Sequence, residues 1–407
     1  MKWELAIVSA SVLAVAGISS RLKDTAFTPA MAFVAIGLLV GPLAVDVVGP
    51  SPAGATVRTL AETTLAIVLF ADASKIKPRL LRRESGVPVR LLAIGLPLTI
   101  VLGAVLAKGI FGHLSVAEAV VLAVLLAPTD AALGQSVVTE PRLPSRIRQG
   151  LNVESGLNDG ICVPLLLVSL AVADVEEKSA TSHHAFTVLA EEIGYGALGG
   201  VAAGLAAAAV VMLGVRRGLI RGSWLQVIPI AGSGLAYGLA VGLGGSGFIA
   251  AFAAGGVFGA LQSRESEQAS RLNEEVGALL GGVTFLIFAA VLLGPALKDV
   301  TWQAALYAVL SLTIVRMLPV AIAMAGSRAN WRTVAFVGWF GPRGLASIVF
   351  AVIVVQEAHL AGAQTILVAT YLAIGLSVFA HGVSAAPLAS RYADWAERHP
   401  RPSAAEA

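Results

Sequence analysis

The chain has 407 residues, of which 57% are hydrophobic and only 13% are charged, and its mean hydropathy is +0.83. Soluble domains are closer to half apolar and a quarter charged, so this composition excludes an ordinary soluble enzyme. The formal net charge of +3, without a dense basic run, argues against nucleic-acid binding. Cys162 is the single cysteine, which excludes an internal disulfide and a cysteine-based metal cluster. We therefore predict an all-α polytopic membrane protein without a cofactor.

Apolar segments long enough to cross the hydrocarbon, about 20 residues each, follow one another along the chain. Thirteen are predicted, near residues 4–19, 27–46, 59–74, 89–112, 117–135, 152–173, 186–213, 224–243, 247–262, 277–296, 302–325, 333–355 and 363–389. The glycine-rich residues 242–247 are either a tight turn between spans 8 and 9 or a flexible point in one long helix. Residues 263–275 predict a short cytoplasmic helix.

Lysine and arginine concentrate in the loops after spans 1, 3, 5, 7, 9 and 11 and in the C-terminal tail. We therefore predict a multi-pass protein of the cell (inner) membrane. By the positive-inside rule, its N-terminus is expected outside the cell and its C-terminus in the cytoplasm. Merging spans 8 and 9 would place the later basic loops on the wrong side, which favours thirteen spans. Residues 75–90 hold six basic residues and predict a cytoplasmic loop that sets the topology and meets anionic lipid headgroups.

Ionisable residues inside the spans are few and grouped. Glu62 and Asp72 lie in span 3, Asp130 in span 5, Glu154, Asn158 and Asp159 in span 6, and Arg316 and Arg343 in spans 11 and 12. Such groups are costly in a membrane and commonly mark an ion or proton pathway. The alternative is that they only bridge helices by hydrogen bonds. The excess of carboxylates over arginines favours a site for a cation or a proton.

Two spans have interrupted helical patterns at matching places. Span 5 contains Pro128 beside Asp130, and span 12 contains glycine and proline at residues 341–344. Interrupted spans in corresponding positions of two halves indicate a transporter site near the bilayer midplane, where the broken helices cross. We predict one membrane domain over residues 1–407, with inverted repeats over roughly 1–175 and 220–390, followed by a short cytoplasmic tail at 391–407.

Six motifs occur across nearly the whole chain in an order typical of one family. They are Phe70-Ala71-Asp72-Ala73, Pro128-Thr129-Asp130, Glu154-Ser155-Gly156-Leu157-Asn158-Asp159-Gly160, Gly245-Ser246-Gly247-Phe248-Ile249-Ala250-Ala251-Phe252, Gly341-Pro342-Arg343-Gly344 and His381-Gly382. With them the sequence resembles the monovalent cation:proton antiporter-1 family, of the prokaryotic sodium/proton type. The resemblance implies a thirteen-helix fold and a homodimer.

The resemblance also implies roles for individual residues. Asp159 would be the main cation and proton carboxylate, and Na⁺ would also bind Asp130, Ser155 and the Thr129 carbonyl. Asp72 stands where some members carry a glutamate ligand. Asn158 replaces the second aspartate of electrogenic relatives, which implies electroneutral exchange. Glu154 and Arg343 would form a structural ion pair between spans 6 and 12.

Several alternatives stay open at the level of sequence. Within the same fold the substrate could be K⁺ or Li⁺ instead of Na⁺, and a cation channel would share the acidic residues. An intramembrane aspartyl protease could use Asp130 and Asp159, although the typical Gly-x-Gly-Asp context is missing. Arg316 either snorkels to the interface or pairs with a carboxylate of span 5 or 6. Residues 194–199 fit a dinucleotide fingerprint, but they lie inside an apolar span, so Gly196 and Gly200 predict close helix packing instead.

Overall fold

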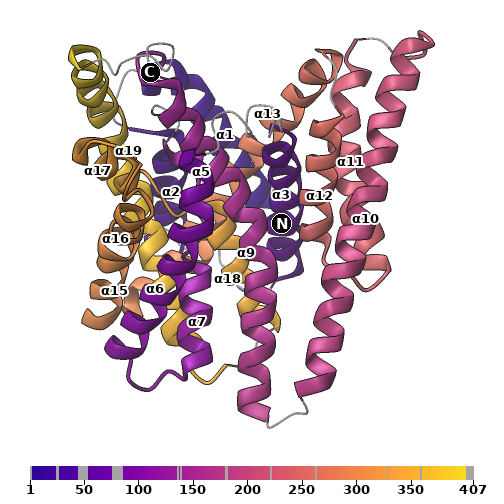
Figure 1. The fold of residues 1–407 in the computed structure, drawn as a ribbon. Helices are drawn as coiled ribbons and strands as arrows, with labels where there is room; N and C mark the ends of the chain where they lie inside the picture. Colours follow the sequence, from indigo (N-terminus) through magenta and orange to yellow (C-terminus); the bar gives the residue numbers. More distant parts are fainter. Residues whose placement is uncertain are drawn as a thin grey trace.

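The computed structural model describes residues 2–23, 27–44, 54–75, 86–134, 137, 140–178, 182–220, 222–261, 264–327, 329–357 and 360–399. Every regular element in these ranges is helical, and each of the thirteen predicted spans contains a helix (Figure 1). The predicted all-α architecture is therefore confirmed. Over the same ranges, seven helical stretches have the length and hydropathy to cross a membrane: Gly86–Ile110, Ser145–Glu176, Thr187–Arg216, Trp224–Gly242, Ser270–Asp299, Trp302–Ala323 and Ala363–Arg398.

The first half of the chain begins with helices that the hydropathy anticipates closely. They are α1 (Lys2–Lys23), α2 (Pro29–Val40), α3 (Ala55–Ser74), α5 (Gly86–Arg90), the π-helical η1 (Leu91–Gly95), α6 (Leu96–Ile110), α7 (Val116–Leu125), the 3₁₀-helical η2 (Ala131–Gly134), α9 (Ser145–Lys178) and α10 (Ser182–Arg216). Span 6 is longer than predicted, because α9 extends beyond the apolar segment 152–173 at both ends. Residues 76–85 of the predicted basic loop lie outside the described residues.

The second half of the chain is also helical. Its elements are α11 (Trp224–Gly242), α12 (Gly247–Ala260), α13 (Arg264–Ile287), the π-helical η3 (Phe288–Leu293), α14 (Gly294–Ala296), the 3₁₀-helical η4 (Leu297–Asp299), α15 (Trp302–Leu312), α16 (Ile314–Ala323), α17 (Trp331–Trp339), α18 (Leu345–Glu357) and α19 (Ala363–Arg398). The predicted tail at 391–407 begins inside α19, and residues 400–407 lie outside the described residues.

The structure distinguishes the two alternatives for residues 242–247 and changes the extent of the helix predicted at 263–275. A turn separates α11 from α12, and within it Gly244 has a φ of +80°, a conformation that residues with a side chain rarely adopt. Spans 8 and 9 are therefore distinct helices. Residues 264–275 are helical as predicted, but they do not form a short helix of their own, because they are the first turns of α13, which continues without a break into span 10.

Small residues let α10 and α12 approach closely, and the two helices lie side by side at the right of Figure 1. A Cβ atom on Gly200 would collide with the backbone oxygen of Ala250, and one on Gly204 would collide with that of Ala254. Gly196 faces the backbone of Ser246 in the same way. The predicted packing role of Gly196 and Gly200 is therefore confirmed.

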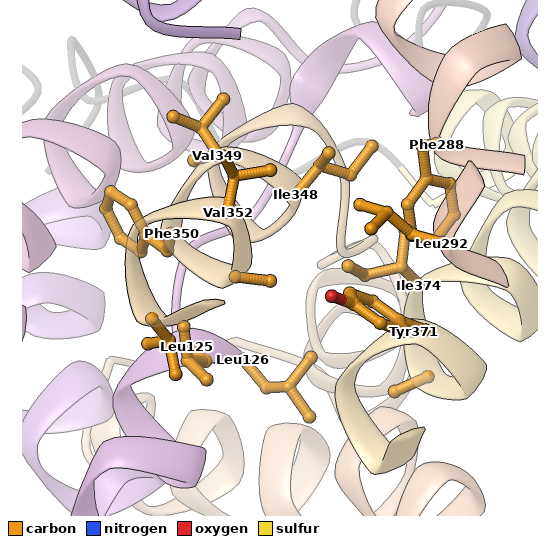
Figure 2. Close-up of a cluster of buried hydrophobic side chains, with 14 of the residues drawn as sticks. Leu125, Leu126, Phe288, Leu292, Ile348, Val349, Phe350, Val352, Tyr371 and Ile374 are labelled. Atoms are coloured by element: carbon orange, nitrogen blue, oxygen red, sulfur yellow. The ribbon is translucent and has the colours of Figure 1, made fainter. Parts of the chain in front are cut away.

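The main core surrounds α18 and fixes its direction. Leu125 from α7, Phe288 from η3, Ile348 from α18 and Tyr371 from α19 are all buried in one cluster (Figure 2). The rings of Phe288 and Tyr371 meet at 5.8 Å with an angle of 69° between their planes, a favourable edge-on arrangement. Because α18 follows directly after the unwound part of span 12, this core holds one side of the candidate site in place.

Candidate functional site

Both interrupted spans are unwound where the sequence predicts it, and their unwound parts touch. Span 5 leaves the α-helical form after α7 and has no regular secondary structure over residues 127–130, and span 12 has none over residues 340–344, between α17 and α18. The backbone N–H of Asp130 donates a hydrogen bond to the carbonyl oxygen of Pro342 at 2.7 Å. The prediction of two broken helices that cross is confirmed.

Each broken span supplies a charge that complements the helix end of the other. The Arg343 guanidinium donates to the carbonyls of Ala127 at 2.8 Å and Pro128 at 3.2 Å, just beyond the C-terminal end of α7. The Asp130 carboxylate accepts the backbone N–H of Leu345, the first residue of α18, at 3.1 Å. A cation at a helix C-terminus and an anion at an N-terminus are the favourable pairings with the helix dipole. Asp130 and Arg343 thus stabilise the crossing reciprocally.

Among the described acidic residues, Asp159 is the one with a buried carboxylate oxygen that has no hydrogen-bond partner. Its side chain is buried, and its Oδ1 atom has no hydrogen-bond partner among the described residues. The charges of Asp130 and Asp72 lie near enough to act on it electrostatically. A buried carboxylate without a partner is costly, and a proton or a bound cation removes that cost. Asp159 is therefore the group of this site best suited to hold either one.

Ser155 and Asn158 fasten the unwound part of span 5 to α9. The Ser155 hydroxyl donates to the Thr129 carbonyl at 2.7 Å and accepts the backbone N–H of Ala131 at 2.8 Å. The Asn158 amide donates to the Thr129 hydroxyl at 2.7 Å, and its oxygen accepts the Thr129 backbone N–H at 3.3 Å. In this conformation the Ser155 and Asn158 side chains and the Thr129 carbonyl are therefore engaged in hydrogen bonds within the protein.

Asp72 lies on α3 beside α9, at the edge of this group. Its Cβ is 3.3 Å from the point where a side chain on Gly156 would begin, so the glycine allows the two helices to approach. The carboxylate pairs with Lys75 at 3.2 Å and is partly exposed. Burial alone would lower the pKa of Lys75, but the carboxylates of Asp72 and Glu274 outweigh it and raise that pKa. Lys75 therefore stays charged at neutral pH beside Asp72.

The predicted ion pair between Glu154 and Arg343 is wrong. Both carboxylate oxygens of Glu154 instead accept hydrogen bonds from Arg316 on α16, the second at 2.8 Å. Gly341 leaves the space for the Arg316 side chain, because a Cβ there would collide with the guanidinium. Arg343 is occupied by the carbonyls of the broken span 5. Of the two roles considered for Arg316, pairing with a span-6 carboxylate is the one observed.

A small cavity of about 20 Å³ lies between the two unwound segments, with room for a water-sized guest. Thr129, Asp130 and Ser155 line it on one side, with Phe340 and Pro342 on the other. Asp159 is not among its lining residues. The structure thus gathers three of the six predicted ion-binding residues around one space, while Asp159 lies one helical turn beyond Ser155 along α9.

The sequence interpretation overlooked one buried carboxylate, Glu118. It accepts the backbone N–H groups of Ser115 at 2.8 Å and of Gly362 at 2.6 Å, and so ties the loop before α19 to the start of α7. The signal was readable, since Ser115 and Glu118 have the spacing of a helix capping box. Because its oxygens are both used, Glu118 has a structural role.

Gly344→Ala is expected to disturb the crossing. A Cβ at this position would collide with the Asp130 carboxylate, which must then leave the start of α18. We expect a loss of roughly 1–3 kcal/mol in unfolding free energy, measured by denaturant titration in detergent. Gly256→Ala on α12 is the matched control, because its new methyl group enters open space. Equal stability of the two variants would contradict this account of Gly344.

Comparison with known proteins places this chain in a recognised family. The pattern of the family described as "Sodium/hydrogen exchanger, transmembrane" matches residues 7–391. The sodium/proton antiporter MjNhaP1 of Methanocaldococcus jannaschii has a similar fold, with a TM-score of 0.75, 20% identity, and coverage of 94% of this chain and 100% of that one.

Two curated relatives are similar over much of this chain. A probable Na⁺/H⁺ antiporter of Schizosaccharomyces pombe is 25% identical over 338 residues, and the K⁺/H⁺ antiporter NhaP2 of Shewanella sp. (strain ANA-3) is 24% identical over 398 residues. These alignments cover 77% and 93% of this chain, but only 44% and 64% of the respective relatives. Since the family pattern spans nearly all of the sequence, the chain belongs to the sodium/hydrogen exchanger family of membrane transporters.

Proposed function

We propose that this protein exchanges a monovalent cation for protons across the membrane by alternating access. The observation that carries the proposal is the buried, unpartnered oxygen of Asp159 beside two crossing unwound helices. A site that is closed by packed helices and lined by half-helix ends suits a carrier better than an open channel. The family is one of transporters, so the protease alternative has no support.

Coupling follows if cation and proton share Asp159. A bare carboxylate is costly to carry through a dry barrier, whereas a neutralised one crosses more easily. The site therefore moves when either a cation or a proton cancels its charge, and it resists movement when empty. No separate proton pathway is needed. In this mechanism Asp130, Ser155 and the Thr129 carbonyl complete the coordination shell of the cation once the local helices rearrange. Asp72, paired with Lys75, lies at the edge of the site, on the path by which the cation would reach Asp159.

We propose Na⁺ as the cation, on the strength of the resemblance and the names of the MjNhaP1 and Schizosaccharomyces pombe relatives. K⁺ is the second candidate, because NhaP2 and other relatives carry the name K⁺/H⁺ antiporter. Everted vesicles with a pH-sensitive dye discriminate between them when Na⁺, K⁺ and Li⁺ are added one at a time. Dye dequenching by K⁺ but not by Na⁺ would reverse the assignment.

Competition at one carboxylate predicts a definite pH dependence. Below the pH at which half of the sites are protonated, the apparent KM for the cation should rise about tenfold for each pH unit, because protons displace the cation. Transport should also slow at high pH, where protons are too scarce to return the carrier. Initial rates in proteoliposomes across pH measure both effects. A KM that stays constant across this range would exclude simple competition.

The exchange is proposed to be electroneutral. Asn158 is uncharged and both of its amide atoms bond to Thr129, so Asp159 is left as the carboxylate that titrates with transport. One cation then moves per proton. In proteoliposomes, a potassium–valinomycin potential at zero pH gradient should drive no flux, provided that K⁺ is not a substrate. Flux that follows the imposed voltage would contradict this stoichiometry.

The assembly and topology are also proposals. We propose a homodimer in the cell membrane, with the N-terminus outside and the C-terminus in the cytoplasm, on the basis of the family resemblance and the distribution of basic loops. Lipid contacts are supported by apolar stripes such as Val101 and Val105 on α6, whose side chains are 59% and 62% exposed. Native mass spectrometry tests the dimer, and accessibility labelling of single cysteines in the loops tests the orientation.

A further inference from the structure

Each broken span leaves helical hydrogen bonds unmade. In a continuous helix the N–H of Ala131 would bond to the carbonyl of Ala127, and the N–H of Arg343 to the carbonyl of Trp339. Both pairs lie at the edges of the unwound segments 127–130 and 340–344. Inside a membrane protein such freed groups need other partners, because an unsatisfied backbone group costs several kcal/mol.

At the first break the partners come from the site already described. The N–H of Ala131 bonds to the Ser155 hydroxyl at 2.8 Å, and the Ala127 carbonyl accepts from the Arg343 guanidinium at 2.8 Å. A serine on the next span and a basic side chain thus replace the missing bond. Ser155 has the titratable Asp159 one helical turn beyond it.

The second break has the same arrangement, made by residues that the transport site does not use. The N–H of Arg343 bonds to the Ser377 hydroxyl at 2.7 Å. The Trp339 carbonyl, which also accepts the N–H of Gly341 at 2.9 Å, contacts Nε2 of His381 at 2.8 Å. Ser377 and His381 lie one turn apart on α19 and are both fully buried. The imidazole also stacks on the Trp339 indole, with ring centres 5.0 Å apart.

We propose that Ser377 and His381 form a polar clamp that holds span 12 open and so positions Pro342 and Arg343 at the exchange site. The clamp acts through the backbone. It fixes the N–H of Arg343, whose guanidinium binds span 5, and it borders Pro342, whose carbonyl receives the N–H of Asp130 at 2.7 Å. Ser377 and His381 are therefore positioning residues, and their influence on transport rests on the function proposed above.

The contact with the Trp339 carbonyl places a proton on Nε2 of the ring. A carbonyl oxygen only accepts, so Nε2 of His381 must donate to Trp339. The other nitrogen, Nδ1, lies 3.2 Å from the Ser377 hydroxyl, which can donate to it, and 3.0 Å from the Ser377 carbonyl. A side chain that keeps an N–H near the Nε2 position should keep the clamp, and one without a donor should lose it.

Hydrogen exchange of the full-length protein tests the clamp directly. In Ser377→Ala the Arg343 amide loses its acceptor, so peptides that contain it should exchange about tenfold faster, whereas Ser377→Thr should match the wild type. Ser347→Ala is the matched control, because the buried Ser347 hydroxyl has no hydrogen-bond partner among the described residues. Unchanged exchange of the Arg343 amide in folded Ser377→Ala would overturn the proposal.

Transport provides the second measurement. His381→Leu should lower the maximal exchange rate about tenfold, while His381→Gln, which keeps an N–H donor, should stay within about twofold of the wild type. Equal rates for the leucine and wild-type proteins would overturn the positioning role. If the wild-type protein itself exchanges no cation for protons, the function proposed above fails, while the hydrogen-exchange result still decides the clamp.

Discussion

Asp159→Asn is expected to abolish cation/proton exchange while the protein remains folded and inserted in the membrane. The amide can neither carry a proton nor balance the charge of a cation, so neither substrate can neutralise the site for the return movement. Because the wild-type carboxylate is buried with an unpartnered oxygen, removing its charge should leave thermal stability equal to or above that of the wild type. Dye dequenching in everted vesicles, together with thermal unfolding in detergent, measures both consequences.

A matched control variant separates this effect from the general effect of removing a carboxylate elsewhere in the protein. Asp299→Asn removes an exposed acid whose side chain accepts a hydrogen bond from the Gln364 amide at 3.0 Å. It should transport like the wild type. Cation-driven proton release by Asp159→Asn at the wild-type rate would remove Asp159 from the mechanism.

The interruption of spans 5 and 12 could be predicted from the sequence because its cause is local. Pro128 and Pro342 cannot donate a backbone hydrogen bond, and glycines on both sides of Arg343 weaken the helix further. The helix count could also be predicted, because hydropathy and loop charge are properties of single segments. The continuity of α13 through residues 264–275 was missed, because the sequence of a polar helix does not show whether it continues into the apolar helix that follows.

Partner choice across helices could not be predicted in this way. The sequence places Glu154 and two arginines inside the membrane, but it does not say which arginine faces which helix. That depends on the crossing of spans 5 and 12, which turns Arg343 toward the open carbonyls of α7, and on the space that Gly341 leaves for Arg316. The role of Asp130 at the start of α18 depends on the same crossing. The residues of the site could therefore be predicted from the sequence one by one, whereas their hydrogen-bond and ion-pair partners required the tertiary structure.

The ion pair between Glu154 and Arg316 leads to the second prediction with a large effect, which concerns the unfolding free energy. Glu154→Gln or Arg316→Gln alone leaves an uncompensated charge in a fully packed environment, and each should lower the unfolding free energy by roughly 3–5 kcal/mol. The double variant removes both charges together and should lose clearly less than the sum of the single losses. Equilibrium unfolding in mixed micelles measures the coupling energy from this double-mutant cycle.

The same cycle with Arg343 in place of Arg316 is the decisive comparison. Arg343→Gln should be destabilising on its own, because the carbonyls of Ala127 and Pro128 lose their donor. Since no hydrogen bond joins Arg343 to Glu154, the coupling energy of this pair should be clearly smaller than that of Glu154 with Arg316. A strong coupling between Glu154 and Arg343, with additive losses for Glu154 and Arg316, would restore the pairing first predicted from the sequence. It would also mean that span 12, and not span 11, is locked to span 6 during transport.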